Sequence, residues 1–219
     1  MMNDKFTEAI DRAKSYVSKL AEEENNLPSN IDLNKIWQLN SRYIVSPIES
    51  AIVIIDQSLA HQRILYDGAI KSFNSSSFSS QTLLFPKKLK FESENFSDLL
   101  DALPYMNRIG FNMKKHGKNS VIIESIPSEM LWGNEIKIVN QMLEDFKLMK
   151  NKELSKEEAI ALSFSNRACI KNGDSLSNSE MVELVNRLFG TNEPFICPNG
   201  NVMLIQISLN EIENKFNRK

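Results

Sequence analysis

The sequence predicts a mixed α/β chain, of the α+β kind, built in two parts. Residues 51–55 are five consecutive apolar residues, mostly β-branched, which is typical of a fully buried strand. Helical patterns follow, and three of them open with a serine and a glutamate three residues on, at Ser155, Ser177 and Ser208. Residues 74–80 are five serines, a Phe and an Asn. They offer little to bury, so they predict a linker at which the chain divides.

The first part is predicted to be a helix, a hairpin and a second helix. Residues 4–24 carry apolar residues at three- and four-residue steps, which indicates an amphipathic helix with a packing or linker role, the alternative being partner binding. Residues 35–45 indicate a strand, and 46–50 a turn that pairs it with the strand at 51–55. A helix is then expected to about Phe73, with Leu59, Ile64, Leu65 and Ile70 among its inward residues.

The middle of the chain is predicted to alternate strands and helices. We expect a strand from residue 81 to about 91, a helix over 96–105, and a hairpin of 108–114 with 120–126. A helix over 134–150 should turn five residues inward: Ile136, Val139, Leu143, Phe146 and Met149.

The last part is predicted to be helical with one late strand. The first two serine caps open helices that end near Gly173 and at Gly190. Residues 194–201 indicate a loop, 202–207 another buried strand, and 208–218 the final helix.

Composition excludes several classes of protein. The chain has 219 residues, a net charge of -2 and 42% hydrophobic residues, so nothing draws it as a whole to nucleic acid. Neither a phosphate-binding Walker loop nor a GxGxxG fingerprint occurs, and no stretch is long enough to cross a membrane. Cys169 and Cys197 are the only cysteines and form no CxxC pair. They predict reduced thiols in a cytoplasmic protein.

A polar pair, Asp56 and Gln57, follows the predicted buried strand directly. Such a pair at the mouth of a strand that leads into a helix is a common place for a functional site. Polar residues also end strands simply because they meet water there, and the residues alone leave both interpretations open.

Several stretches resemble the C-terminal domain of MutL, the DNA mismatch repair protein. Residues 56–67 read DQSLAHQRILYD, and the family motif is DQHAxxExxxxE. Five further stretches agree with the family in order. Residues 38–43 (QxHNxY) precede this motif, and residues 168–169 (ACR), 173–181 (GxxLSxxEM), 197–200 (CPHGR) and 216–218 (FxR) come after it. The resemblance runs from about residue 35 to the end of the sequence.

The resemblance implies a two-subdomain fold and a V-shaped homodimer. Residues 1–30 would be a linker with its helix, 31–80 and 155–219 the dimerisation subdomain, and 81–154 an inserted regulatory subdomain. It also implies a MutS-type mismatch recognition protein, a sliding clamp and DNA bound without sequence specificity as partners, in the cytoplasm of a bacterium at the nucleoid. The ATPase half of the family is absent from these residues, so the chain is expected to belong to a longer protein or to work beside a separate ATPase.

Many family members carry a metal-dependent nicking endonuclease, and its ligand set is broken here. The motif His is Ser58, the motif Glu is Gln62 and the loop His is Asn199. These neutral side chains are poor ligands for a divalent ion. The sequence therefore predicts a degenerate centre without nicking activity and no resident cofactor.

The alternative is an active metal-dependent nickase with an altered ion. By the resemblance, Asp56 and Asp67 would be its catalytic acids, and Cys169 and Cys197 would hold zinc or manganese weakly. The two cysteines are otherwise small buried hydrophobes.

Two surface functions are predicted for the middle part. Residues 81–86 fit QxxLxP, the form of peptides that dock on the bacterial sliding clamp, with Gln81 hydrogen-bonding and Leu84 and Pro86 filling an apolar pocket. Three lysines that follow, Lys87, Lys88 and Lys90, would contact DNA phosphates. A solvated face explains these lysines equally well. The predicted function is thus homodimerisation and clamp docking in mismatch repair.

Overall fold

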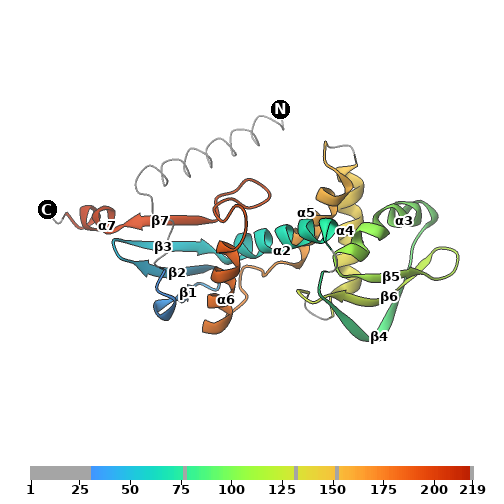
Figure 1. The fold of residues 1–219 in the computed structure, drawn as a ribbon, viewed down its shortest axis with the longest axis horizontal. Coiled ribbons are helices and arrows are strands. Elements are labelled where there is room, and N and C mark those ends of the chain that lie inside the picture. The colour runs from blue at the N-terminus through green and yellow to red at the C-terminus, as the bar shows by residue number, and fades with distance from the viewer. Residues whose placement is uncertain (1–30, 76–77, 131–132, 151–152, 218–219) are drawn as a thin grey trace. The chain divides into compact units, whose positions relative to one another are not determined.

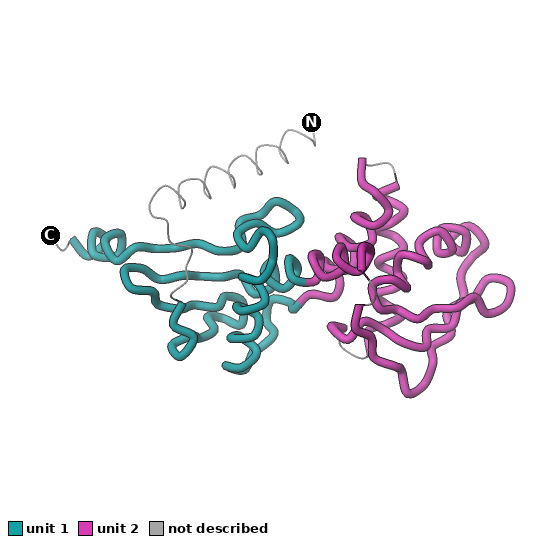
Figure 2. Tube along the Cα trace, viewed as in Figure 1, with its two compact units in different colours: residues 1–64, 170–219 teal, residues 65–169 magenta. Residues whose placement is uncertain are grey.

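A computed structural model describes residues 31–75, 78–130, 133–150 and 153–217. The chain forms two compact units (Figure 2). Unit 1 comprises residues 1–64 and 170–219, and unit 2 comprises residues 65–169. The helix predicted over residues 4–24 and the loop after it lie outside the described residues. Within the described ranges, no helix is long and apolar enough to cross a membrane.

Unit 1 is built on a four-stranded antiparallel sheet with the order β1-β2-β3-β7 (Figure 1). Its strands are β1 (Trp37–Leu39), β2 (Tyr43–Ile48), β3 (Ala51–Asp56) and β7 (Leu204–Ser208). The predicted hairpin of two neighbouring strands is confirmed as the β2–β3 pair.

The single strand predicted over 35–45 is wrong, because the chain reverses within it. Asn40 and Ser41 have positive φ angles of 51° and 47° and form the tight turn between β1 and β2. Asn tolerates this left-handed conformation better than most residues. The predicted turn over 46–50 is also too long, because Ser46 and Pro47 continue β2 and pair with Val53 and Ile52.

One face of this sheet packs against helices. The short 3₁₀ helix η1 (Leu33–Lys35) precedes β1, and the helices of unit 1 are the first part of α2 (Gln57–Asn74), α6 (Asn178–Phe189) and α7 (Leu209–Lys215). The core joins one face of the sheet to α2 and α6, and its main members are Ile44, Val53, Ile55, Leu204, Ala60, Ile64, Leu184 and Leu188. The predicted capping boxes of α6 and α7, at Ser177 and Ser208, are confirmed.

The opposite face of the sheet is also apolar, and part of it is exposed. Burial alternates along β3: Ala51, Val53 and Ile55 are buried, while Ile52 and Ile54 are half-buried. The expectation of a fully buried strand is therefore wrong for β3, and also for the late strand, where Ile205 is 41% exposed. Residues that lie opposite each other on paired strands share a face, which groups seven side chains here: Trp37, Leu39, Val45, Ile52, Ile54, Ile205 and Ile207. We call this set the apolar sheet face.

Unit 2 packs helices on a three-stranded antiparallel sheet with the order β4-β6-β5. Its elements are the later part of α2, β4 (Ser80–Lys90), α3 (Ser93–Arg108), β5 (Asn112–Lys115), β6 (Ser120–Pro127), α4 (Glu135–Met149) and α5 (Lys156–Ala168). One core joins helices and sheet, with Phe146, Phe164, Leu99, Met106 and Ile123 among its most buried members. The predicted hairpin of β5 and β6 and the capping box at Ser155 are confirmed.

Three details of unit 2 differ from the sequence prediction. Helix α3 continues through Pro104 to Arg108, so Pro104 lies inside the helix and Arg108 is not in a strand. On α4, Ile136 is 43% exposed, while Ile138 and Met142 point inward. Helix α5 ends at Ala168, well before Gly173.

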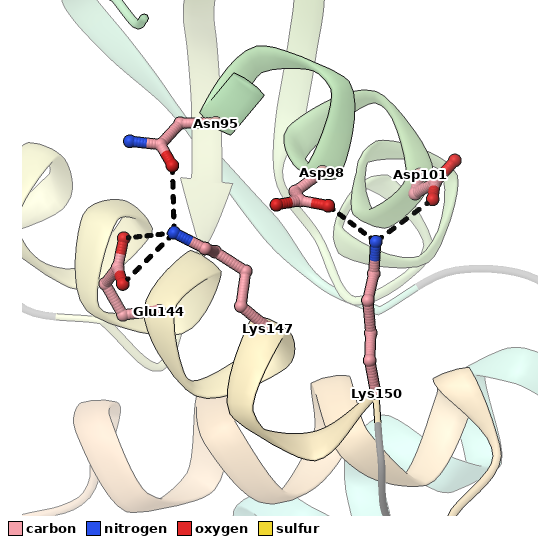
Figure 3. A network of polar contacts seen from close by, with 6 residues as sticks. All are labelled: Asn95, Asp98, Asp101, Glu144, Lys147 and Lys150. Carbon is pink, nitrogen blue, oxygen red and sulfur yellow. Dashed lines mark hydrogen bonds and ion pairs between the residues drawn. The ribbon is translucent and has the colours of Figure 1, made fainter.

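Ion pairs connect the helices of unit 2. Asp145 on α4 accepts hydrogen bonds from Nε and Nη2 of Arg167 on α5 at 2.9 and 2.7 Å, which raises the pKa of Arg167. At the end of α4, Nζ of Lys150 lies 2.6 Å from Oδ1 of Asp98 and 3.3 Å from Oδ2 of Asp101 on α3 (Figure 3). The hydrogen bond with Asp98 is the main cause that raises the pKa of Lys150.

Lys147, one turn before Lys150, adds a second connection between α4 and α3. Its Nζ lies 2.8 Å from Oδ1 of Asn95 on α3, and it also bonds Glu144 on its own helix (Figure 3). These contacts fix α3 against α4 on the outside of the unit 2 core.

The two compact units divide the chain at other residues than the sequence suggested. The composition boundaries fell after residues 80 and 154, whereas the units divide after residues 64 and 169. Helix α2 continues through the boundary between the units at residues 64 and 65, and its residues Leu65 and Ala69 belong to the core of unit 2. Residues Ile160 and Phe164 of α5 are buried in the same core, which places α5 with unit 2. The serine-rich stretch thus follows the boundary rather than marking it.

Candidate functional site at the end of strand β3

Asp56, the predicted catalytic acid, ends β3 and caps helix α2. Its Oδ1 accepts hydrogen bonds from the backbone N–H groups of Ser58 and Leu59 at 3.0 and 3.1 Å. Its Oδ2 lies 3.7 Å from Nε of Arg42 in the β1–β2 hairpin. Such a carboxylate satisfies backbone donors that the first turn of a helix would otherwise leave without partners. The contacts of Asp56 are therefore those of a helix cap paired with a cation.

Gln57, its neighbour, lies fully buried at the centre of a hydrogen-bond network in unit 1. Its Nε2 lies within 3.0 to 3.1 Å of the carbonyl oxygens of Ser41, Lys171 and Asp174. Its Oε1 accepts a 2.6 Å hydrogen bond from Nε2 of Gln38 on β1. A buried amide with every polar atom engaged fixes the segments it contacts.

Gln38 completes the same network from the sheet. It donates to the carbonyl of Asp174 at 2.9 Å and accepts from the N–H of Leu176 at 3.3 Å. The N–H of Gly173, which has a φ of 102°, donates to the carbonyl of Ser41 at 2.8 Å. These bonds join residues 171–176 to the turn end of the β1–β2 hairpin. The sequence analysis identified Gln57 only as one of two polar residues at the end of a strand. Both Gln38 and Gln57, however, lie in stretches that match family motifs.

Two side chains on the next turn of α2 bind loops of the same unit. Nδ1 of the buried His61 accepts the N–H of Ile170 at 3.0 Å. The buried guanidinium of Arg63 donates from Nε and Nη2 to the carbonyl of Ile196 at 2.9 and 2.7 Å, and Nη2 also pairs with Glu193. Arg63 thereby fixes the loop that carries Cys197. Sequence reasoning missed this residue, because nothing in its spacing separates it from a surface arginine.

The structure distributes the four residues of the alternative nickase over both units. Asp56 and Cys197 belong to unit 1, and Asp67 and Cys169 to unit 2. Cys197 is 1% exposed and sits in a tight turn, where its carbonyl accepts the N–H of Gly200 at 2.8 Å. Cys169 follows α5, with its thiol 3.6 Å from the carbonyl of Asn166. No disulfide joins these two cysteines, both of which are described.

The residues present do not fit a divalent metal. Over the ranges 31–75, 78–130, 133–150 and 153–217, no three His, Cys, Asp or Glu side chains gather in a way that could hold an ion. The side chains at the other motif positions, Ser58, Gln62 and Asn199, are neutral. No chemical step through a metal follows from this arrangement.

The QxxLxP stretch forms a wide bulge in β4. Thr82 pairs with Ser125 of β6 and Lys87 with Ile123, so residues 83–86 stand opposite one residue of β6. Within the bulge Leu83 is buried, but Leu84 is 78% and Phe85 72% exposed. Pro86 is exposed as well. A bulge displaces the strand from its partner and redirects its side chains, and here it presents two large apolar side chains to solvent.

Gln81, at the start of this stretch, is engaged within its own chain. Its Nε2 donates to the carbonyls of Met130 at 2.7 Å and Pro127 at 3.3 Å. The predicted hydrogen bond from Gln81 to a partner would therefore require these contacts to break. Phe85, which the sequence analysis did not single out, is more accessible to a partner than Gln81, which is only half-exposed.

The predicted DNA-binding lysines are all exposed on β4. Lys87, Lys88 and Lys90 follow the bulge. In the sheet, Lys88 of β4 and Lys114 of β5 lie on either side of Ile122 of β6 and share its face. Nζ of Lys114 lies 2.6 Å from the Glu124 carboxylate, which neutralises part of this positive surface.

Comparison with known proteins places this arrangement in a family. The family model of the MutL C terminal dimerisation domain matches residues 36–176, more than half of the chain. The chain belongs to this family. The resemblance drawn from the motifs is thereby confirmed.

The MutL relatives are bacterial proteins of about three times the length. The DNA mismatch repair protein MutL of Prosthecochloris aestuarii is 36% identical over 204 residues, which cover 92% of this chain and 33% of the relative. That of Chlorobaculum tepidum is 39% identical over 188 residues, 84% of this chain and 30% of the relative. That of Chlorobium phaeobacteroides strain BS1 is 36% identical over 186 residues, with coverages of 84% and 30%. The chain thus spans about a third of the MutL proteins it matches.

Proposed function

We propose that this chain joins two copies of a mismatch repair MutL protein through the apolar sheet face of unit 1. The observation that supports this is a four-stranded sheet with one apolar face on the core and a second that is partly exposed. On the second face Trp37 is 49%, Ile205 41% and Leu39 38% exposed. Large apolar side chains that are exposed on one face of a sheet mark an interaction site.

A second copy of the chain is the partner that this face fits. The family model that matches the chain is one of a dimerisation domain. A two-fold interface uses the same surface on both subunits, and two twisted sheets pack well face to face when both faces are apolar. Ile52 and Ile54 at the centre of the sheet would then become buried, as their β-branched side chains favour.

The mass of the chain in solution tests this proposal. Sedimentation equilibrium at micromolar concentration should give twice the 25.0 kDa of one chain. A single-chain mass across the whole range of concentration would overturn the proposal.

We further propose that the dimer lacks nicking activity. Neutral side chains at positions 58, 62 and 199 and the capping contacts of Asp56 support this. Supercoiled plasmid incubated with the chain and manganese should remain supercoiled. Nicking that disappears in a Cys197→Ala and Asp56→Asn variant would instead establish the alternative, an active metal-dependent nickase.

A second candidate function is docking on a sliding clamp through the β4 bulge. The exposed Leu84 and Phe85, with Pro86 beside them, support it. A short segment held in one conformation by strands on both sides loses little entropy when it binds an apolar pocket. The exposed Lys87 and Lys88 next to the bulge would favour a pocket with an acidic rim.

Alanine in place of the two exposed apolar side chains of the bulge should weaken docking strongly. We expect a Leu84→Ala and Phe85→Ala variant to bind the clamp about a hundredfold more weakly, since two well-packed apolar anchors carry most of such a contact. Calorimetry with purified clamp measures the change. Leu148→Ala is the matched control, because Leu148 is 74% exposed but lies on α4. Equal affinity of the bulge variant and the control would exclude this mode of docking.

DNA contact and a MutS-type partner complete the proposed role. The relatives are DNA mismatch repair proteins by name, and the exposed lysines of β4 could bind phosphates without reading sequence. Binding through Lys87, Lys88 and Lys90 would weaken steeply with salt.

A further inference from the structure

One face of the unit 2 sheet carries a row of basic side chains. Lys88 of β4 and Lys114 of β5 lie on either side of β6, in register with the same residue. Side chains alternate along a strand, so Lys90 and His116, each two residues further on, share this face. Both lie beside Ser120, since Lys90 is in register with it and the N–H of His116 donates to its carbonyl at 2.8 Å. We call these four exposed residues the basic sheet face: Lys88, Lys90, Lys114 and His116.

The other face of this sheet is the one on which the helices of unit 2 pack. Leu89 of β4 and Met113 of β5 lie on it and belong to the core. Lys87 and Lys115, which are two residues from these core positions, lie on the same side. Nζ of Lys115 is 5.8 Å from the centre of the Phe96 ring of α3. Lysines that are neighbours in the sequence are thus separated onto two faces of the sheet.

The charge on the basic sheet face is mostly positive. Glu124 of β6 is the only acid in the three strands of this sheet, all of which are described. Its carboxylate pairs with Nζ of Lys114 at 2.6 Å. Asp98 and Asp101 of α3 pair with Lys150 of α4, on the side of the helices. The basic sheet face is therefore a positive surface on a chain whose net charge is -2.

We propose that the basic sheet face binds the phosphate backbone of duplex DNA. This inference rests on the DNA contact proposed above and assigns it to one face, and it does not depend on the dimer. Strands are about 4.8 Å apart, so Lys88 and Lys114 lie about 10 Å from each other across β6 and present two separate charges to a phosphate backbone. Lys118, exposed in the turn between β5 and β6, extends the row.

The chemistry of this face favours a nucleic acid over a protein partner. Lysine is depleted in the interfaces between proteins, which centre on aromatic and apolar side chains. Its ammonium group binds phosphate oxygens as a point charge and carries no information on base sequence. The basic sheet face would therefore hold DNA without sequence specificity.

Two double variants with the same change of charge test which face binds. Lys88→Ala with Lys114→Ala removes one lysine from β4 and one from β5 on the basic sheet face. Lys87→Ala with Lys115→Ala removes their neighbours on the other face and is the matched control. Anisotropy of a fluorescently labelled DNA duplex measures binding to the full chain over a range of salt concentrations. We expect the first variant to bind about tenfold or more weakly, with a slope of log affinity against log salt that is smaller by about two. The control should keep the slope of the unchanged chain.

The Glu124→Gln variant should bind DNA more tightly than the unchanged chain. It removes the carboxylate that pairs with Lys114 and retains an oxygen for the hydrogen bond that Asn112 donates to Glu124 at 3.1 Å. The ammonium group of Lys114 is then free to bind a phosphate, so we expect about threefold or more in affinity and a slope larger by about one. Damage to the fold would weaken binding instead, which makes this gain a separate readout.

The outcomes separate this inference from the proposed DNA contact. Equal weakening of the two double variants, or a Glu124→Gln variant that binds no more tightly, would overturn the basic sheet face and leave the DNA contact standing. An unchanged chain that does not bind the duplex even at low salt would overturn both. Polyglutamate that competes as well as unlabelled duplex would assign the face to an acidic protein and overturn its assignment to DNA.

Discussion

The Ile205→Asp variant is expected to be a monomer at concentrations at which the unchanged chain is a dimer. Ile205 lies on the apolar sheet face, in register with Ile54 and Val45. A carboxylate buried there without a partner costs about 2 kcal/mol or more in each protomer. A two-fold interface contains the change twice, so dimer affinity should fall about a thousandfold.

The control for this variant is unusually well matched. Ile136 on α4 is 43% exposed, close to the 41% of Ile205, and lies in unit 2. Ile136→Asp should leave the dimer intact, because a carboxylate in the first turn of a helix is also favourable there. Sedimentation equilibrium of both variants measures the difference. Equal affinities would show that the sheet face takes no part in dimerisation.

The Gln57→Glu variant is expected to lose about 3 to 5 kcal/mol of unfolding free energy at neutral pH, the effect of a buried charge without compensation. The new carboxylate has the shape of the amide, so no cavity forms. It would, however, place an oxygen against the carbonyls of Ser41, Lys171 and Asp174, where Nε2 of Gln57 now donates. Urea denaturation followed by circular dichroism measures the loss.

The same variant should recover stability as the pH falls. Burial and the facing carbonyls raise the pKa of the new carboxyl in the folded state above about 4.3, its value in an unfolded chain. The folded state then binds more protons, so stability decreases as the pH rises from about 4.3 through the raised pKa. Gln206→Glu, at an exposed position of β7, is the control and should change stability by less than about 0.5 kcal/mol at any pH. A similar loss in both variants, without pH dependence, would contradict the structural role of Gln57.

Local signals in the sequence predicted the elements of this fold well. All three capping boxes form, because the serine and glutamate of each are neighbours on the first turn and need no distant partner. The hydrophobic run at residues 51–55 does form a strand. It could not reveal that only Val53 and its neighbours on one face are buried in the core, because an apolar residue on an interface and one in a core look alike in sequence.

Features that depend on tertiary contacts were not predictable in the same way. Helix α2 has one continuous pattern, and only the packing of Leu65 shows where the second unit begins. The buried roles of Gln57 and Arg63 depend on carbonyls more than 110 residues away in the chain. The β4 bulge arises because residues 83–86 stand opposite one residue of β6, a register that no local motif encodes.

The environment of Trp37 is the most direct test of the proposed dimer, because this side chain lies on the apolar sheet face and is 49% exposed in one chain. The sequence contains two tryptophans, so a Trp132→Phe variant leaves Trp37 as the only one. Its fluorescence and its quenching by iodide would be followed through a dilution series, with the mass measured in parallel. If the apolar sheet face forms the interface, Trp37 emission shifts to the red and is quenched more strongly as the dimer dissociates. Constant emission and quenching while the mass falls by half would contradict this interface.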